Sequence, residues 1–237
     1  MTDRPLGEPV PGWTPPPRPG PEAMEGRWAR LERLDPSRHA AEVHAANLAS
    51  DAIWDWMPYG PFREEGDWRA WAEGMAARED PFFYAIRDRA TGRAGGVAAF
   101  LRIAPEAGSI EVGHIALAPA LQRTAAATDA MHLMMRWAFE AGYRRYEWKC
   151  NALNLPSRRA GQRLGLSFEG VFRQHMVVKG RNRDSAWFAA TDRDWPRLGA
   201  AFEAWLAPEN FDAEGRQRVA LSLLTAPVLV ARDPMLG

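Results

Sequence analysis

Apolar and polar residues along this chain follow two periods, and each period predicts one kind of element. Alternation with a period of two indicates a strand, whereas apolar residues three or four positions apart indicate a helix. Strand character is found at residues 26–34, 81–88, 93–103 and 109–117. Short helices are predicted at residues 36–48 and 64–77. A turn at residues 90–92 joins the second and third strands, so residues 81–117 predict an antiparallel meander.

A longer helix follows the meander, at residues 124–141. Its apolar residues recur with the 3.6-residue period of a helix and Gly142 ends it; they are Ala127, Met131, Met134, Met135, Ala138 and Ala141. Residues 143–150 then form a strand with Tyr146, Trp148 and Cys150 on one face and Arg145, Glu147 and Lys149 on the other. Strand, helix and strand in this order predict a βαβ unit with parallel strands and a right-handed crossover.

The remaining chain predicts a helix at residues 154–164, strands at 167–179 and 184–191, and a helix within 192–206. The two strands turn at residues 180–182. Together the elements predict one α+β domain over residues 25–206. Eight prolines between Pro5 and Pro21 predict that residues 1–24 form an extended arm, because proline lacks an amide proton and has a fixed φ.

Residues 207–237 exceed what this domain needs. The segment 219–230 is apolar enough to require cover. Docking on its own domain is the simpler expectation, and a homodimer interface is the alternative, because an exposed apolar strip promotes association.

Composition narrows the class of protein. A chain of 237 residues with 46% apolar residues and 11 tryptophans can bury one substantial core. Thirty basic residues balance thirty acidic ones, which removes the long-range positive field that nonspecific nucleic-acid binding requires. The single cysteine, Cys150, cannot form an internal disulfide, and no leader or membrane-spanning run is present. We expect a cytoplasmic enzyme or binding protein that binds neither nucleic acid nor membrane.

Several motifs in the second half of the chain carry a family resemblance. Ile110-Glu-Val-Gly-His-Ile-Ala-Leu117 leads into Gln122-Arg-Thr-Ala-Ala-Ala-Thr128, and Asn154-Leu-Pro-Ser157 precedes Arg163-Leu-Gly-Leu-Ser-Phe-Glu-Gly170. These segments resemble the GNAT superfamily of N-acetyltransferases, and the later ones resemble its ribosomal-protein N-terminal acetyltransferase branch (RimJ/RimL-like). The resemblance implies a mixed, mostly antiparallel sheet with a central splayed parallel strand pair. It also implies acetyl-CoA as cosubstrate, an amine acceptor such as a peptide N-terminus or a small amine, and no metal.

The loop at Gln122 has a physical reason to bind a pyrophosphate. A helix N-terminus supplies free amide donors and a favourable potential for an anion. The family prefers glycine at the positions of Ala125 and, often, Ala127, so the backbone here must accept a Cβ at each. The resemblance implies these coenzyme contacts: Ile115, Ala116, Leu117, Gln122, Arg123, Thr124, Ala125, Ala126, Ala127, Thr128, Asn151, Asn154 and Ser157.

Acetylation of an amine requires that the amine lose a proton before it attacks. Glu111 is the favoured candidate base and His114 the second, since both lie on the strand that lines the reaction centre in relatives. Regular alternation puts them on opposite faces, unless a bulge near Gly113 changes the parity. Ser157 is the candidate acid for the departing thiolate. An inert role for each residue, and catalysis without a side-chain base, stay open.

Several other residues have side chains that could react or bind a ligand, and each also has a simpler structural explanation. Cys150 has no histidine and acid partner at a recognisable spacing, so a buried strand position is expected. The five histidines show no metal-ligand pattern. Arg181 and Arg183 attract a carboxylate or phosphate, or form a solvated turn. The aromatic loop 51–62 forms a wall of the acceptor pocket or only packs. A noncatalytic acyl-CoA sensor and a partner-binding module are the alternatives to an enzyme.

Overall fold

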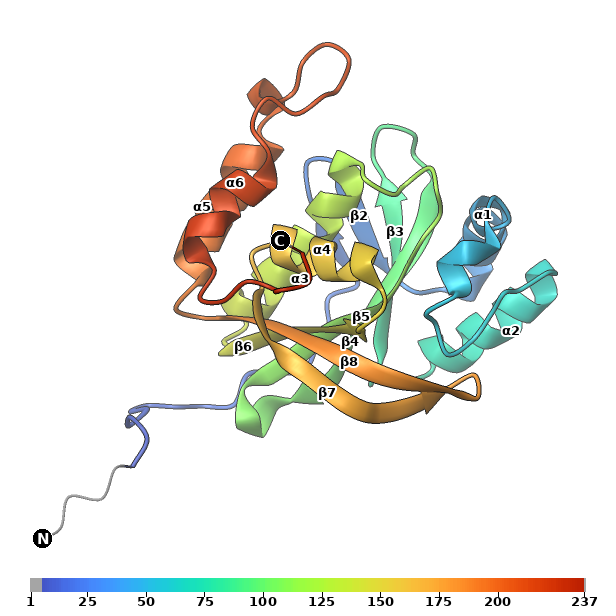
Figure 1. Ribbon diagram of the computed structural model, residues 1–237. Coiled ribbons are helices and arrows are strands. Elements are labelled where there is room, and N and C mark those ends of the chain that lie inside the picture. Colours follow the sequence, from blue (N-terminus) through green and yellow to red (C-terminus); the bar gives the residue numbers. More distant parts are fainter. Residues whose placement is uncertain (1–5, 237) are drawn as a thin grey trace, which may run out of the picture.

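Eight strands form one sheet in the order β1-β2-β3-β4-β5-β6-β8-β7 in the computed structural model, which describes residues 6–236 (Figure 1). The strands are β1 Ala23–Glu25, β2 Ala29–Arg33, β3 Phe82–Asp88, β4 Ala94–Ala104, β5 Ser109–Leu117, β6 Arg145–Asn151, β7 Ser167–Val178 and β8 Arg181–Thr191. The α-helices are α1 Pro36–Asn47, α2 Glu65–Ala76, α3 Ala125–Glu140, α4 Leu155–Arg163, α5 Trp195–Leu206 and α6 Leu221–Thr225.

Every pairing in this sheet is antiparallel except that of β5 with β6, which is parallel. Helix α3 connects the two parallel strands. The predicted fold class, a mixed and mostly antiparallel sheet with a central parallel pair, is therefore confirmed, as is the βαβ unit.

Two predicted elements differ in detail from the structure. The strand expected at residues 26–34 corresponds to β2 alone, and β1, which pairs with β2 across a turn at Gly26, begins at Ala23 within the expected arm. Strand β8 begins at Arg181, three residues earlier than predicted, because Lys179 and Gly180 form a tight turn with φ values of 49° and 71°. Two residues with positive φ match the twist of a hairpin, so the strands pair directly up to the turn.

The turn at Gly26 has a packing cause. A Cβ at this position would lie 2.2 Å from Oδ2 of Asp129, a buried residue of α3. The same carboxylate oxygen accepts hydrogen bonds from the amides of Trp28 and Ala29, at 2.7 and 3.0 Å. Only glycine leaves room for this contact, which fixes the first strands to a helix about a hundred residues away.

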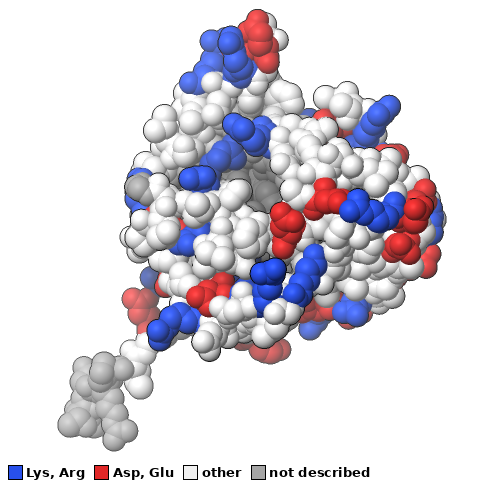
Figure 2. Space-filling view, turned by 45° about the vertical axis from the view of Figure 1, so that its right-hand side comes forward, with Lys and Arg blue, Asp and Glu red and all other residues white. Residues whose placement is uncertain are grey.

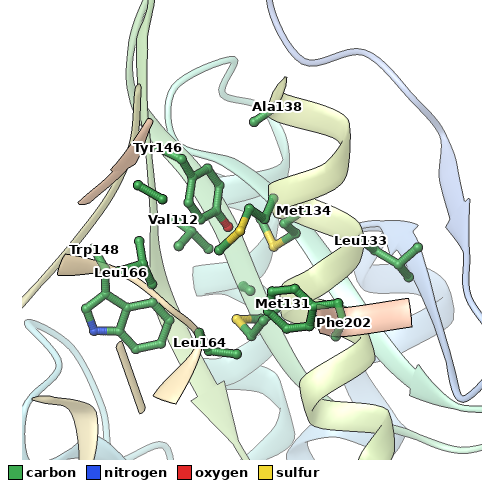
Figure 3. Close-up of a cluster of buried hydrophobic side chains, with 14 of the residues drawn as sticks. Val112, Met131, Leu133, Met134, Ala138, Tyr146, Trp148, Leu164, Leu166 and Phe202 are labelled. Carbon is green, nitrogen blue, oxygen red and sulfur yellow. The ribbon is translucent and has the colours of Figure 1, made fainter. Parts of the chain in front are cut away.

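Helices cover both faces of the sheet and bury two apolar clusters. The larger cluster lies between α3, α5 and one face, and Figure 3 shows Met134 of α3 directed toward Val112 and Tyr146 of the sheet, with Met131 near Leu164 and Phe202. The smaller cluster lies under α1 and α2 on the other face, around the fully buried Trp68. The polar groups of the candidate site lie at the ends of β5 and β6, between these two layers of helices.

Both chain extensions contact the sheet domain. The hydroxyls of Tyr143 and Tyr84 donate to the carbonyls of Pro17 and Pro21, at 3.1 and 3.0 Å. The first five residues of the predicted arm lie outside the described residues. At the other end, Leu221 is fully buried in the larger cluster.

A buried ion pair holds the end of the C-terminal extension. Asp233 accepts from Nε and Nη2 of Arg158 on α4, at 2.6 and 2.5 Å. Between residues 6 and 236, no helix is long and apolar enough to cross a membrane.

Candidate active site

The parallel strands β5 and β6 separate partway along their length. Their pairing runs from Ser109↔Arg145 to Val112↔Trp148, whereas β5 stays paired with β4 as far as Leu117. Residues 113–117 therefore have no strand partner on the β6 side within the described part of the chain. The predicted splay of the central pair is present, and it opens beside the N-terminus of α3.

The polar main-chain groups of Leu117 face this gap. The amide of Ala118 donates to the carbonyl of Gly95, so the antiparallel ladder turns the neighbouring residue, Leu117, away from β4. The side-chain amide of Gln122 donates to the Leu117 carbonyl at 2.8 Å, which fixes that direction. Ala116, by contrast, faces β4 opposite Val97, and its side chain is buried.

The loop that follows β5 leads into α3. Arg123 has a φ of 62°, and Thr124 is the N-cap of the helix. The Thr124 hydroxyl accepts from the Ala127 amide at 3.1 Å and donates to the Leu121 carbonyl at 2.7 Å. This cap satisfies one of the first amides and leaves those of Ala125 and Ala126 at the positive end of the helix. Their small side chains place little bulk in front of these donors.

Thr128 lies one turn further along α3 and is buried. Its hydroxyl donates to the Thr124 carbonyl at 3.3 Å and accepts from Arg163 of α4 at 3.2 Å. The side chain therefore joins α3 to α4.

The start of α4 faces the other side of the gap. Asn154 is the N-cap, and its side-chain oxygen accepts from the Ser157 amide at 3.1 Å. The Ser157 hydroxyl accepts from the indole Nε1 of Trp148 at 3.0 Å. Asn151, at the end of β6, uses its side chain to accept from the Leu153 amide. These predicted contacts thus lie together, where β6 ends and α4 begins.

A bulge in β5 determines where its polar side chains point. Val97 and Ala99 of β4 pair with Ala116 and Gly113, so three steps on β5 oppose two on β4. His114 lies in the bulge with a φ of 51°. The parity changes there, and Glu111 and His114 come to the same face of the sheet, as the sequence analysis allowed for a bulge near Gly113.

His114 is held in an aromatic setting. Its Nδ1 lies 2.9 Å from the hydroxyl of Tyr59, and its ring packs against Tyr59 and Phe83. Burial, assisted by the charges of Arg102 and Arg183, lowers the pKa of His114 to about 4. The imidazole is therefore neutral near pH 7 and able to accept a proton.

Glu111 is held by two cations. Nη1 of Arg102 donates to both carboxylate oxygens at 2.8 Å, and Nζ of Lys149 lies 2.9 Å from Oε2. Burial raises the pKa of Glu111, and the charges of Lys149 and Arg102 act in the opposite direction. The carboxylate is thus committed to an ion-pair network.

Two walls border this face of the sheet. One is the aromatic loop 51–62, in which Trp54 is buried and Tyr59 packs on Trp71 of α2. The other is the β7–β8 hairpin, where the Lys179 ammonium donates to the Trp54 carbonyl at 3.0 Å and joins the walls. Figure 2, with the α1–α2 side brought forward, shows a hollow near the centre of this face with side chains of both charge signs at its rim.

Two members of the site escaped the sequence analysis. Lys149 was placed on the strand face opposite Trp148, but its contacts with Glu111 and Glu147 depend on neighbouring strands. Tyr59 lies in the loop expected to form a wall or to pack, and its bond to His114 spans 55 positions. Period-two alternation was the available signal for Lys149, while no local pattern indicates the Tyr59 contact.

The thiol of Cys150 adjoins Ser157 and is shielded from solvent. Cys150 is buried, which raises the pKa of its thiol. Over residues 6–236, no three His, Cys, Asp or Glu side chains are grouped so as to hold a metal ion.

Comparisons with known proteins add to this geometry. Residues 29–167 match the family described as acetyltransferase (GNAT) domain. The structure is similar to a GCN5-related N-acetyltransferase from Brucella melitensis, with 44% identity, a TM-score of 0.89, and coverage of 92% of this chain and 100% of the other. It is also similar to a protein assigned to the GNAT acetyltransferase family from Chromobacterium violaceum, with 36% identity, a TM-score of 0.77, and coverage of 83% and 99%.

A third similar structure is RimL, the ribosomal L7/L12 alpha-N-protein acetyltransferase, at 20% identity with a TM-score of 0.62. The alignment covers 72% of this chain and 94% of RimL, and identity at this level shows a shared fold alone. No protein of curated function matches the chain in sequence.

Proposed function

This chain belongs to the GNAT family of acetyl-CoA-dependent acetyltransferases, and we propose that its acceptor is a primary amine, a peptide N-terminus or a small amine, which attacks the thioester directly. The observation that carries the proposal is the gap between β5 and β6, where the polar groups of Leu117 face away from β4. This gap lies next to the amides at the start of α3.

These residues fit acetyl-CoA. The amides of Ala125 and Ala126, at the positive end of α3, are suited to the pyrophosphate, and the small side chains allow a close approach. The Leu117 amide is suited to the acyl end, where it stabilises the negative charge that develops on the carbonyl oxygen. The coenzyme supplies the activated acetyl group, and this chain supplies the donors and the cleft.

His114 is the proposed base, ahead of Glu111. As the amine nitrogen bonds to the carbonyl carbon and the carbon–sulfur bond breaks, the nitrogen loses a proton. The tautomer of His114 that donates from Nδ1 to Tyr59 leaves Nε2 free to accept this proton. Glu111 instead holds Arg102 and Lys149 in place.

Ser157 is the proposed acid for the thiolate. Its oxygen accepts from Trp148, so its own proton is available for donation, and its place at the start of α4 follows from the Asn154 cap. The thiolate takes the Ser157 proton and leaves as the free thiol, and Ser157 regains a proton from solvent.

Release of free thiol from acetyl-CoA, measured with a broad panel of primary amines, tests the proposal. Amine-dependent release of coenzyme A, with acetylated amine detected by mass spectrometry, is the expected result. A folded protein that releases no thiol with any amine would overturn it.

A noncatalytic acyl-CoA sensor is the second candidate, and the commitment of Glu111 to two cations favours it. Calorimetry separates the two roles, because the sensor binds acetyl-CoA without amine-dependent turnover.

A further inference from the structure

Arg183 is a half-buried cation of β8 that lies on the open face of the sheet. Alternate β8 residues, Ala186 and Phe188, belong to the larger apolar cluster, so Arg183, Ser185 and Trp187 point to the opposite face. Trp187 packs there under the ammonium of Lys149, 3.7 Å from its ring centroid. Pairing of β6 with β8 ends at Asn151↔Ser185, so Arg183 lies just past the end of β6.

Three other cations on this face are matched by carboxylates. Arg102 pairs with Glu111, Lys149 with Glu111 and Glu147, and Arg145 with Glu147 and Glu169. Three cations thus stand against three carboxylates in one continuous network. The network is balanced without Arg183.

Arg183 has no such partner. Its Nε donates to the Ser185 hydroxyl at 3.2 Å, and within residues 6–236 its guanidinium makes no other hydrogen bond and no ion pair within 4.0 Å. Four of its five N–H donors are therefore uncommitted. Burial lowers the pKa of Arg183 and the charge of Glu111 partly opposes this effect, but no carboxylate contacts the guanidinium. Its free donors can therefore bind a ligand that carries a negative charge.

A ligand bound to Arg183 would lie in the part of the cleft that contains His114, where the acceptor amine is proposed to bind. Arg183 is close enough to His114 and His175 for its charge to lower the pKa of both. Ser185, its hydrogen-bond partner, lies 2.9 Å from Nδ1 of His175. An anion on Arg183 would accordingly lie in the same cleft as the proposed base.

Guanidinium geometry specifies the chemistry of the anion. The planar fork of arginine presents parallel N–H donors that match the oxygens of a carboxylate or a phosphate. Arg181, two residues earlier on the same strand, is exposed and is the matched comparison.

We infer that Arg183 binds a carboxylate or phosphate group of the acceptor, so that the preferred acceptors are amines bearing a nearby negative charge rather than polyamines. This inference rests on the proposed amine acetylation and adds the acceptor class. Arg183 acts here as a specificity-determining residue, and the proton transfer remains with His114.

Matched acceptors that differ in one charge test the inference. β-Alanine is compared with β-alaninamide, 2-aminoethyl phosphate with ethanolamine, and the peptide amide Ala-Asp with Ala-Asn, with putrescine as a cationic amine. We expect wild-type kcat/KM to favour the anionic member of at least one pair by about 10- to 100-fold, the range for a hydrogen-bonded charge. The pair with the largest preference shows whether Arg183 favours a carboxylate or a phosphate, and a small amine or a peptide.

Two substitutions of Arg183 test whether this residue causes the preference for anionic acceptors. Arg183→Gln should abolish it, chiefly through a higher KM for the anionic acceptor and with a smaller change for the neutral one, and Arg183→Lys should retain part of it. Arg181→Gln should behave as wild type. Thermal unfolding and acetyl-CoA affinity of each variant check that the fold and the coenzyme site are intact.

Equal wild-type rates with both members of every pair would overturn the inference while leaving the proposed function standing. An equal loss by Arg183→Gln with charged and neutral acceptors would do the same. No thiol release with any amine would overturn the proposed function itself.

Discussion

His114 has a φ of 51°, in the left-handed region that a residue with a Cβ seldom adopts. Strain of this kind is on the order of 1–3 kcal/mol and is retained where the surrounding structure imposes it. The bulge that requires it brings His114 beside Tyr59 and puts it on the face of Glu111. At the residue scale, backbone geometry therefore decides which polar groups meet.

His114→Asn tests the proposed base. Asparagine tolerates positive φ, so the bulge should persist, and kcat should fall by about 10²- to 10⁴-fold, the usual contribution of a positioned base. The affinity for acetyl-CoA, measured by calorimetry, should not change. A loss of kcat smaller than threefold would remove His114 from the mechanism.

The pH dependence of the wild-type enzyme supplies an independent check on His114. Because the base acts in its neutral form and burial lowers its pKa to about 4, protonation of His114 should abolish kcat only as the pH falls through about 4. Stopped-flow kcat measurements from pH 4 to 8 should show no His114 inflection near 6.5. An inflection there that His114→Asn abolishes would contradict a buried, neutral imidazole.

At the scale of elements, the start of α3 is capped by Thr124 and is the proposed binding site for the pyrophosphate of the coenzyme. Thr124→Val removes the hydroxyl that caps the Ala127 amide, so the free energy of unfolding should fall by about 1 kcal/mol and the Kd for coenzyme A should rise. Asp35→Ala is the matched control, because Asp35 caps α1, away from the gap. It should lose similar stability in urea denaturation with no change in Kd. Equal Kd values for the two variants would show that the Thr124 cap does not contribute to coenzyme binding.

Elements were more predictable than contacts between them. The period of the apolar residues indicated the bounds of β5 and α3 closely, although β5 contains a bulge and α3 is buried at every position from Ala126 to Met135. The exact turn of the last hairpin was missed because the backbone adopts positive φ at Lys179, a non-glycine residue. The partners of Glu111 were not predictable, because Arg102 and Lys149 reach it from neighbouring strands.

At the scale of the whole molecule, the C-terminal extension is bound to α4, which begins beside the gap between β5 and β6. Asp233→Asn breaks the buried pair with Arg158 and should lower the free energy of unfolding by about 3–5 kcal/mol, because a buried charge is left unmatched. The pair of Asp212 with Arg216 at the surface is the control, and Asp212→Asn should lower the free energy of unfolding much less, because solvent screens the pair. Urea denaturation measures both, and similar values would show that the extension is not held by this pair.

A second network sets the stability of the first strands in acid. Burial raises the pKa of Glu32, but hydrogen bonds from His39 and Arg87 outweigh it and hold this pKa at about 2. A lowered pKa means that the contribution is complete above the ordinary value near 4.5 and is lost as the pH falls toward 2. In Glu32→Gln, the free energy of unfolding measured by denaturation should therefore depend less on pH between about 4.5 and 2 than in wild type. A curve parallel to that of wild type would contradict this assignment.

The bond between Asp129 and the amides of Trp28 and Ala29 also bears on how the chain is made. Its partners are separated by 101 and 100 positions, and at a synthesis rate of about 5–20 residues per second that distance corresponds to roughly 5–20 s. During this interval the nascent N-terminal strands have emerged from the ribosome without their anchor. Productive folding of the N-terminal edge is thus tied to translation of α3, and a pause before that helix would lengthen the exposure of an unpaired edge to chaperones and to neighbouring chains.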